Sequence, residues 1–335
     1  MGISYKQFEN KIIEYTLKNN NGMTVKVINI GCSITEILVP DKHGEFHNVV
    51  LRNEYLDGYF ENGNFFGAVV APIAGRVENA EFTIGDDNYS FKANQGNHLL
   101  HSGNLNLYNK IWKSSVEEEK VVFQYKMGTE FPGRPLIRVM YSLSDDNELK
   151  LEYEVDAVSA SVVAPTNHTY FNLSNDLTED VSNHAIKADV KSFLKMDEDL
   201  IPISAEEPAG VFDLNEGKVF GDVFKSEDTQ MKIANDGFDH YFIFNKNNRA
   251  VEVSDERSGR TLKVTTSFPG MVLYTGNNLN ENTDLKDRQP QKHAGFCLET
   301  QESPAALKIP LGFDVRINGN EIYKRQTVFS FGVNK

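Results

Sequence analysis

Cysteine is scarce in this sequence of 335 residues, which contains only Cys32 and Cys297. Two thiols cannot form a dense disulfide framework, and these two lack the spacing of a zinc site. The first residues contain no apolar stretch after their first charges, so we expect no signal peptide, and no apolar run in the sequence approaches the roughly 18 residues that cross a bilayer. These absences predict a soluble cytoplasmic protein whose two thiols are structural.

Basic residues are also few. The chain has 34 Lys and Arg side chains against 48 Asp and Glu, a net charge of −14. A surface this negative repels phosphate backbones and anionic lipids, so we expect no nucleic-acid partner and no membrane partner. The 40% hydrophobic and 24% charged residues indicate a globular protein with enough apolar material for a core. Small neutral ligands are compatible with this composition.

The hydrophobic pattern mostly repeats every two residues, in short segments that Gly, Asn and Asp separate. Three pairs of segments predict β-hairpins: 136–143 with 149–155, 82–84 with 89–91, and 250–253 with 261–264. Further strands are expected at 121–125, 241–244, 271–274, 295–300 and 327–331. Helical stretches are few and short. The pattern therefore predicts an all-β fold, a large antiparallel β-sandwich.

The length alone would accommodate two average domains. However, the sequence shows no internal repeat, no low-complexity tract and no Pro/Ser-rich linker that would divide it. Two polar stretches, 176–180 and 283–291, are better explained as loops within one domain. We therefore expect residues 1–335 to form a single domain.

Four polar patches interrupt or end the predicted strands, at 97–103, 167–173, 237–241 and 296–301. Side chains alternate between the two faces of a strand. In the second patch His168, Tyr170 and Asn172 would therefore share one face, and the apolar side chains between them would take the other. In the last patch Glu299 would lie opposite Leu298. A carboxylate in an apolar strand needs a partner or a function.

Each of these residues also has a structural explanation. His168 could be a core histidine that a backbone carbonyl satisfies, and Glu299 could be an ion-pair partner. Asp239 follows Gly-Phe and is better explained, on its own, as a turn residue that closes an Asx hydrogen bond. Arg76 would ordinarily be a solvated charge.

His98 and His101 lie three residues apart, a spacing that metal ligands can have. No cysteine or carboxylate set at a recognisable spacing accompanies them, and a lone His-x-x-His is a weak signal. We therefore predict no metal at this position.

The patches fall into a recognisable order along the chain. It contains Leu-His-Ser-Gly at 100–103, Asn-His-Thr-Tyr-Phe-Asn-Leu at 167–173, Phe-Asp-His at 238–240, Tyr-Thr-Gly-Asn at 274–277 and Phe-Cys-Leu-Glu-Thr-Gln at 296–301. In this order the segments resemble the signatures of the aldose 1-epimerase (galactose mutarotase) family. The resemblance implies the galactose mutarotase-like supersandwich fold. It also implies an enzyme that interconverts the α and β anomers of a free aldose such as galactose or glucose.

The resemblance assigns three residues to proton transfer. Glu299 resembles the family's general base, His168 its general acid, and His101 the second active-site histidine, which hydrogen-bonds near the ring oxygen. Opening a hemiacetal requires one group that removes a proton from the anomeric hydroxyl and one that delivers a proton to the ring oxygen. Because proton transfer and positioning suffice, no metal and no other cofactor is implied.

Three more residues are implied in binding a monosaccharide, the small-molecule partner that we expect. Arg76 and Asp239 resemble residues that hold substrate hydroxyls, and Tyr170 is expected to line the pocket. Three positions depart from the family pattern: the usual Asn before the arginine is Gly75, a glutamine is replaced by Val272, and Ser102 stands before the second glycine of the Leu-His-Gly-Gly loop. The preferred sugar therefore does not follow from the motifs, and nothing in the sequence specifies an oligomeric state.

Three other functions compete with this interpretation. A non-catalytic sugar-binding protein on the same fold would need neither an acid nor a base. A glycosidase that uses Asp239 and Glu299 as its carboxylate pair would leave His168 and His101 without a role. A hexose-6-phosphate 1-epimerase would need clustered Arg or Lys side chains, whereas the motifs place only Arg76 near the site.

Overall fold

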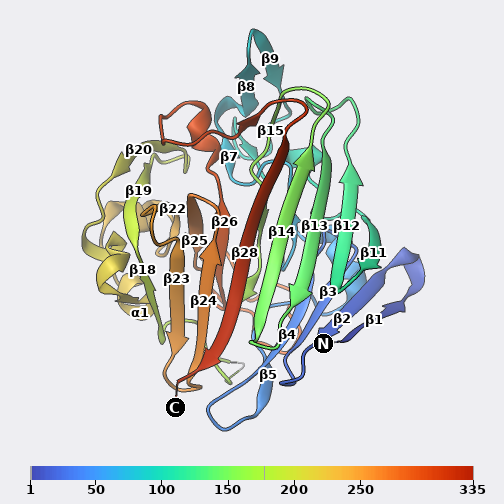
Figure 1. Cartoon of the computed structure of the whole chain (residues 1–335). Coiled ribbons are helices and arrows are strands. Elements are labelled where there is room, and N and C mark those ends of the chain that lie inside the picture. Colours follow the sequence, from blue (N-terminus) through green and yellow to red (C-terminus); the bar gives the residue numbers. More distant parts are fainter. Residues whose placement is uncertain (1, 177, 335) are drawn as a thin grey trace.

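The computed structural model describes residues 2–176 and 178–334, and antiparallel strands dominate it (Figure 1). They form three large sheets of nine, six and five strands, together with four two-stranded ribbons. The predicted all-β class is confirmed. The predicted hairpins at 136–155, 82–91 and 250–264 are confirmed too, since each pair of segments is hydrogen-bonded in antiparallel register.

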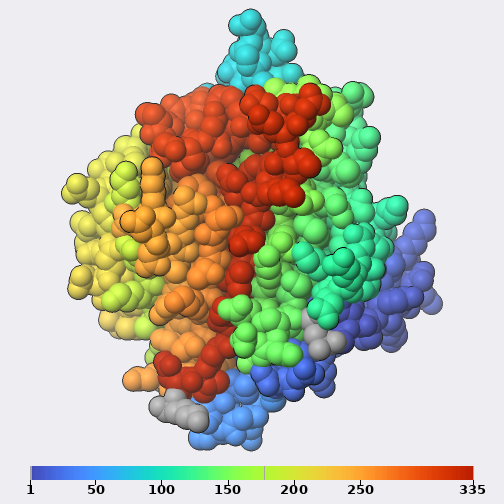
Figure 2. Space-filling model, in the orientation of Figure 1, coloured from blue at the N-terminus to red at the C-terminus, as the bar shows by residue number. Residues whose placement is uncertain are grey.

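The nine-stranded sheet has the C-terminal strand near its centre. Its spatial order is β11 (Lys113–Glu117), β12 (Lys120–Lys126), β13 (Leu136–Leu143), β14 (Glu148–Asp156), β28 (Ile322–Val333), β24 (Arg260–Thr266), β23 (Ala250–Asp255), β18 (His184–Ala188) and β21 (Lys218–Val219). Figure 2 shows β28 in red between the green and orange parts of the chain. The last strand of the sequence thus joins segments from its middle and its end.

The six-stranded sheet carries the site described below. Its spatial order is β17 (Tyr170–Phe171), β26 (Phe296–Gln301), β25 (Gly270–Tyr274), β22 (Asp239–Phe244), β19 (Val190–Met196) and β20 (Pro202–Glu206). In Figure 1, β22, β25 and β26 lie behind β23 and β24. This arrangement makes the two sheets the layers of a sandwich.

Contacts between the two sheets are close and mostly apolar. The rings of Phe171 in β17 and Phe329 in β28 pack with centroids 5.6 Å apart. The hydroxyls of Thr300 in β26 and Thr327 in β28 lie 2.6 Å apart. This hydrogen bond satisfies two buried polar groups between the two sheets. One face of β26 is therefore committed to the core, and its opposite face is available to a site.

The five-stranded sheet packs at the side of the nine-stranded one. It consists of β1 (Gly2–Gln7), β2 (Ile13–Lys18), β3 (Thr24–Ile28), β4 (Ile34–Pro40) and β5 (Phe46–Asn48). Tyr15 packs edge-on against Phe123 of β12, with ring centroids 5.8 Å apart, and its hydroxyl donates to the Ser114 hydroxyl.

Short elements complete the chain. The ribbons pair β6 (Val69–Val70) with β16 (Thr166–Asn167), β7 (Arg76–Val77) with β10 (Leu99–Leu100), β8 (Glu81–Ile84) with β9 (Asp87–Ser90), and β15 (Ser161–Val162) with β27 (Arg316–Ile317). The helices are α1 (Phe220–Val223), α2 (Thr229–Ile233) and 3-10 turns at Glu9–Lys11, Leu56–Glu61, Glu78–Ala80, Gly103–Leu105, Gly210–Phe212, Leu214–Glu216 and Pro304–Leu307. In the described part of the chain, none of these helices is long and apolar enough to cross a membrane.

The strand predicted at 167–173 is wrong in one respect. The chain pairs with β6 through Asn167, leaves it, and then pairs with β26 through Tyr170. His168 lies between the two short strands, where its backbone N–H donates to Ala68. β17 ends at Phe171, so Asn172 lies beyond the paired strand. Its side chain donates to the backbone carbonyls of Glu179 and Ala294 and does not join His168 at the site.

Candidate active site

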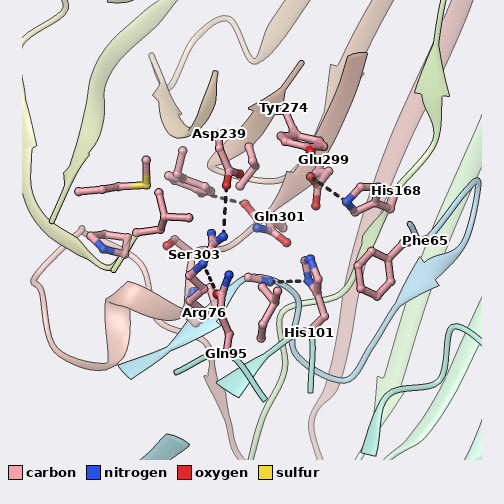
Figure 3. A pocket seen from close by; sticks show the side chains of 18 of the residues that line it. Phe65, Arg76, Gln95, His101, His168, Asp239, Tyr274, Glu299, Gln301 and Ser303 are labelled. Atoms are coloured by element: carbon pink, nitrogen blue, oxygen red, sulfur yellow. Dashed lines mark hydrogen bonds and ion pairs between the residues drawn. The ribbon is translucent and has the colours of Figure 1, made fainter. Parts of the chain in front are cut away.

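A cavity of about 190 Å³ lies on the free face of the six-stranded sheet (Figure 3). Its floor comes from β26, β25, β22, β19 and β20, and its other walls come from the loops around residues 63–76, 95–101 and 303–304. All six side chains that the sequence assigns to the site line this cavity: Arg76, His101, His168, Tyr170, Asp239 and Glu299. The structure thus brings them together, and their individual roles stay predictions.

Strand alternation in β26 explains the position of the carboxylate. Glu299 and Gln301 line the cavity, while Thr300 between them contacts β28 of the opposite sheet. Cys297, two residues before Glu299, lies on the same face and contacts His168. The predicted parity of this segment is therefore correct.

Glu299 and His168 form a buried pair. The distance between Glu299 Oε1 and His168 Nε2 is 3.5 Å, and the two residues are only 3% and 4% exposed. Burial, followed by the charge of nearby Asp239, raises the pKa of Glu299 well above its usual value. Burial also lowers the pKa of His168 to about 4. Both shifts favour a pair that shares one proton and carries no net charge.

The His168 ring has a defined orientation. Its Nδ1 lies 3.5 Å from the Sγ of Cys297, so Nε2 is the ring nitrogen that faces Glu299 and the cavity. The rings of Tyr170 and Phe65 pack on it, with centroids 5.1 and 5.4 Å away. Nε2 is therefore the atom that can exchange a proton with a ligand.

His101 is held as a neutral hydrogen-bond donor. Its Nδ1 accepts a hydrogen bond from the Gly75 backbone N–H at 3.1 Å, which leaves the proton on Nε2. Burial, then the charges of His168 and Arg76, lowers the pKa of His101 well below its usual value. Near neutral pH this ring therefore offers an N–H group to an oxygen in the cavity.

Arg76 and Asp239 form an ion pair in the cavity. Arg76 donates from Nη2 to Asp239 Oδ2 at 3.2 Å and from Nε to Gln95 Oε1 at 2.7 Å. Two structural explanations from the sequence are therefore wrong. Arg76 is not a solvated charge, because its side chain is paired and only 13% exposed. Asp239 is not a turn residue, because it begins β22 opposite Tyr274.

The His98 and His101 rings make separate contacts with the backbone. His98 is absent from the cavity lining, and its Nδ1 accepts a hydrogen bond from the Asn79 backbone N–H at 3.1 Å. His101 is tied to Gly75 in the same way. In each ring, Nδ1 is therefore occupied by a hydrogen bond from a backbone N–H.

Several residues of the cavity had no role in the sequence interpretation. Phe65 packs on both His101 and His168, and its backbone has a φ of 60°, which non-glycine residues rarely adopt. Gln95 holds Arg76 from the side opposite Asp239. For Gln301 a signal existed, since it shares the strand face of Glu299, but for Phe65 and Gln95 no sequence pattern pointed to the site.

Comparisons with known proteins agree with this geometry. The family model for aldose 1-epimerase matches residues 14–330. The chain is 33% identical to the galactose mutarotase of Rattus norvegicus over 320 residues, 93% of this chain and 92% of the relative. It is 28% identical to the aldose 1-epimerase of Escherichia coli K12 over 309 residues, 88% of this chain and 87% of the relative.

A solved structure gives the same result at the level of the fold. The crystal structure of galactose 1-epimerase from Lactobacillus acidophilus NCFM superposes with a TM-score of 0.88 at 28% identity, and the match covers all of both chains. The match of the family model to nearly the whole sequence agrees with the motif order. The chain belongs to the aldose 1-epimerase family.

Proposed function

We propose that this protein is a mutarotase that interconverts the α and β anomers of a free aldohexose, such as galactose or glucose. The observation that carries the proposal is the Glu299–His168 pair, whose facing atoms are 3.5 Å apart in a small cavity. Hemiacetal opening needs a base and an acid within reach of two oxygens on the same carbon. A pure binding site would have no use for this arrangement.

The reaction balances without any added reagent. The step starts from the form of the pair that carries its shared proton on His168. Glu299 then takes the proton of the anomeric hydroxyl, and His168 Nε2 gives its proton to the ring oxygen. The C1–O5 bond breaks while C1 becomes an aldehyde carbon, and the proposed role of the neutral His101 N–H is to donate a hydrogen bond to the ring oxygen. After rotation about C1–C2 the two groups reverse their roles, and the ring closes as the other anomer. Both protons return to their starting groups.

The proton count of the pair predicts a bell-shaped pH profile. The active pair holds one proton, whichever group carries it. Below about pH 4, where His168 is protonated in addition to Glu299, no base is left and the rate falls. Above the raised pKa of Glu299 both groups have lost their protons, no acid is left, and the rate falls again.

Polarimetric kcat/KM values across pH, corrected for the spontaneous rate, measure this profile. A rate that follows a single ionisation near pH 6.5, as an ordinary histidine would give, would contradict it.

Asp239 and Arg76 are proposed to hold the sugar hydroxyls. Charge-assisted hydrogen bonds of this kind contribute about 1.5–3 kcal/mol. We expect Asp239→Asn to raise KM roughly 10- to 100-fold and to change kcat much less. Asp236 is a partly exposed aspartate that pairs with Lys232 and Lys292. Asp236→Asn is the matched control and should leave KM unchanged. Initial polarimetric rates over a range of sugar concentrations separate the two constants, and an unchanged KM in Asp239→Asn would exclude this role.

The charges of the cavity favour an unphosphorylated substrate. Among its lining residues in the described chain, Arg76 is the only Lys or Arg side chain, and Asp239 already pairs with it. A phosphate site typically uses several such cations. Polarimetry or NMR exchange with a panel of aldoses and their 6-phosphates tests the proposal. We expect acceleration with the free sugars, and faster turnover of a 6-phosphate would favour the hexose-phosphate epimerase instead.

The site also supports the proposal that residues 1–335 act as one domain. The side chains of one cavity come from β7 near the start of the chain and from β26 near its end. A division near the middle would split the Arg76–Asp239 pair.

A further inference from the structure

Gln301 has a buried amide oxygen without a partner. It is the last residue of β26, it is 1% exposed, and its side chain lines the cavity. Its Oε1 has no hydrogen-bond partner among the described residues. Nearly all buried polar atoms in proteins are hydrogen-bonded. An unpaired oxygen that lines a cavity is therefore a candidate to bind a ligand.

The backbone of Gln301, in contrast, is firmly held. Its carbonyl accepts a hydrogen bond from the Tyr241 hydroxyl at 2.8 Å, and the residue pairs with Gly270 of β25. The strand position is thus fixed without any contribution from the amide. Figure 3 shows this side chain between the Arg76–Asp239 pair and the Glu299–His168 pair.

The backbone of Gly75 lies close beside the amide. A Cβ atom on Gly75 would lie 3.6 Å from Gln301 Nε2 and 3.3 Å from the Pro304 ring, and the second distance is tighter than an ordinary van der Waals contact. The φ of 81° at Gly75 also favours glycine. Glycine at position 75 therefore keeps a side chain away from the Gln301 amide.

A structural glutamine in the same protein shows the contrast. Gln230 is also buried, and its amide bonds twice to the Met196 backbone, with Oε1 accepting at 2.7 Å and Nε2 donating at 2.9 Å. These two bonds satisfy the backbone N–H and carbonyl of Met196 at the end of β19. The amide of Gln301 makes no comparable contact with the fold.

We propose that the Gln301 amide binds a substrate hydroxyl and so contributes to sugar specificity. The inference rests on the proposed function. Two residues along a strand span about 7 Å, so Gln301 faces ring carbons on the side remote from the anomeric carbon that Glu299 serves. A hydroxyl both donates and accepts, which suits the carbonyl oxygen and the NH₂ group of one amide.

The test replaces the amide with an apolar group of similar length, Gln301→Met. We expect KM for the preferred aldose to rise at least tenfold, with a much smaller change in kcat. The melting temperature should stay the same or rise, because the variant removes an unpaired buried oxygen. Gln230→Met provides the reference for a structural glutamine, and its melting temperature should fall.

A panel of 3-deoxy and 4-deoxy sugars identifies the hydroxyl. With the sugar that lacks the bound hydroxyl, wild type and Gln301→Met should show the same KM. Dissociation constants from NMR titration should follow the same pattern. An unchanged KM in Gln301→Met would overturn this inference but not the proposed function. The same holds for a lowered melting temperature together with an equal rise in KM for every sugar. A wild-type protein that neither binds nor converts any aldose would overturn the proposed function as well.

Discussion

Replacing Glu299 with glutamine is expected to slow anomer equilibration by about 10² or more while the protein stays folded. Glutamine has nearly the same shape as glutamate, so the packing of β26 should survive. The amide cannot accept the proton of the anomeric hydroxyl, and its NH₂ group would face His168 Nε2 in place of a carboxylate oxygen that lies 3.5 Å away. Polarimetry of a freshly dissolved anomer measures the loss.

Glu302→Gln is the matched control for this variant. Glu302 is as buried as Glu299, but it accepts hydrogen bonds from Tyr323 and Arg325 and does not line the cavity. The control should lower stability and leave the rate per folded molecule unchanged. Near-normal turnover in folded Glu299→Gln would remove Glu299 from the mechanism.

The second large effect is expected for His168→Asn, with a loss of roughly 10² to 10³ in kcat. Asparagine is polar but cannot deliver a proton to the ring oxygen. In the wild type the rate falls below about pH 4 because His168 becomes protonated. His168→Asn should therefore not show this fall in rate. The pH dependence separates loss of an acid from simple loss of packing against Tyr170.

His98→Asn is the control for this histidine. His98 lies outside the cavity and hydrogen-bonds the Asn79 backbone, so its loss should affect stability more than rate. A His168→Asn variant that keeps both its rate and its acid limb would show that another group supplies the proton.

The hairpins show what could be predicted from the sequence. In β13 and β14 apolar residues alternate with polar ones, and Asp and Asn residues form the turn, so local chemistry determines both strands and their register. The face of β26 that carries Glu299 followed from the same alternation. The remaining residues of the cavity were predicted by resemblance to the motifs of the family, because no local pattern identified them.

The failures have a common physical cause. Between Asn167 and Tyr170 the chain exchanges one partner strand for another, and such a change depends on distant strands that a local pattern does not contain. Arg76 and Asp239 each had an ordinary explanation alone, and only the fold places them 3.2 Å apart across 163 positions of sequence. Phe65 contacts the histidines through a rare backbone conformation that no local sequence pattern predicts.

The central claim is that Glu299 and His168 act as one unit. Polarimetry of freshly dissolved α-galactose with wild type, both single variants and the double variant Glu299→Gln/His168→Asn tests it directly. Groups that act as a unit are strongly non-additive, so the double variant should be about as slow as the slower single variant. A wild type that leaves the spontaneous rate unchanged, or a double variant whose loss is the product of the two single losses, would contradict the account.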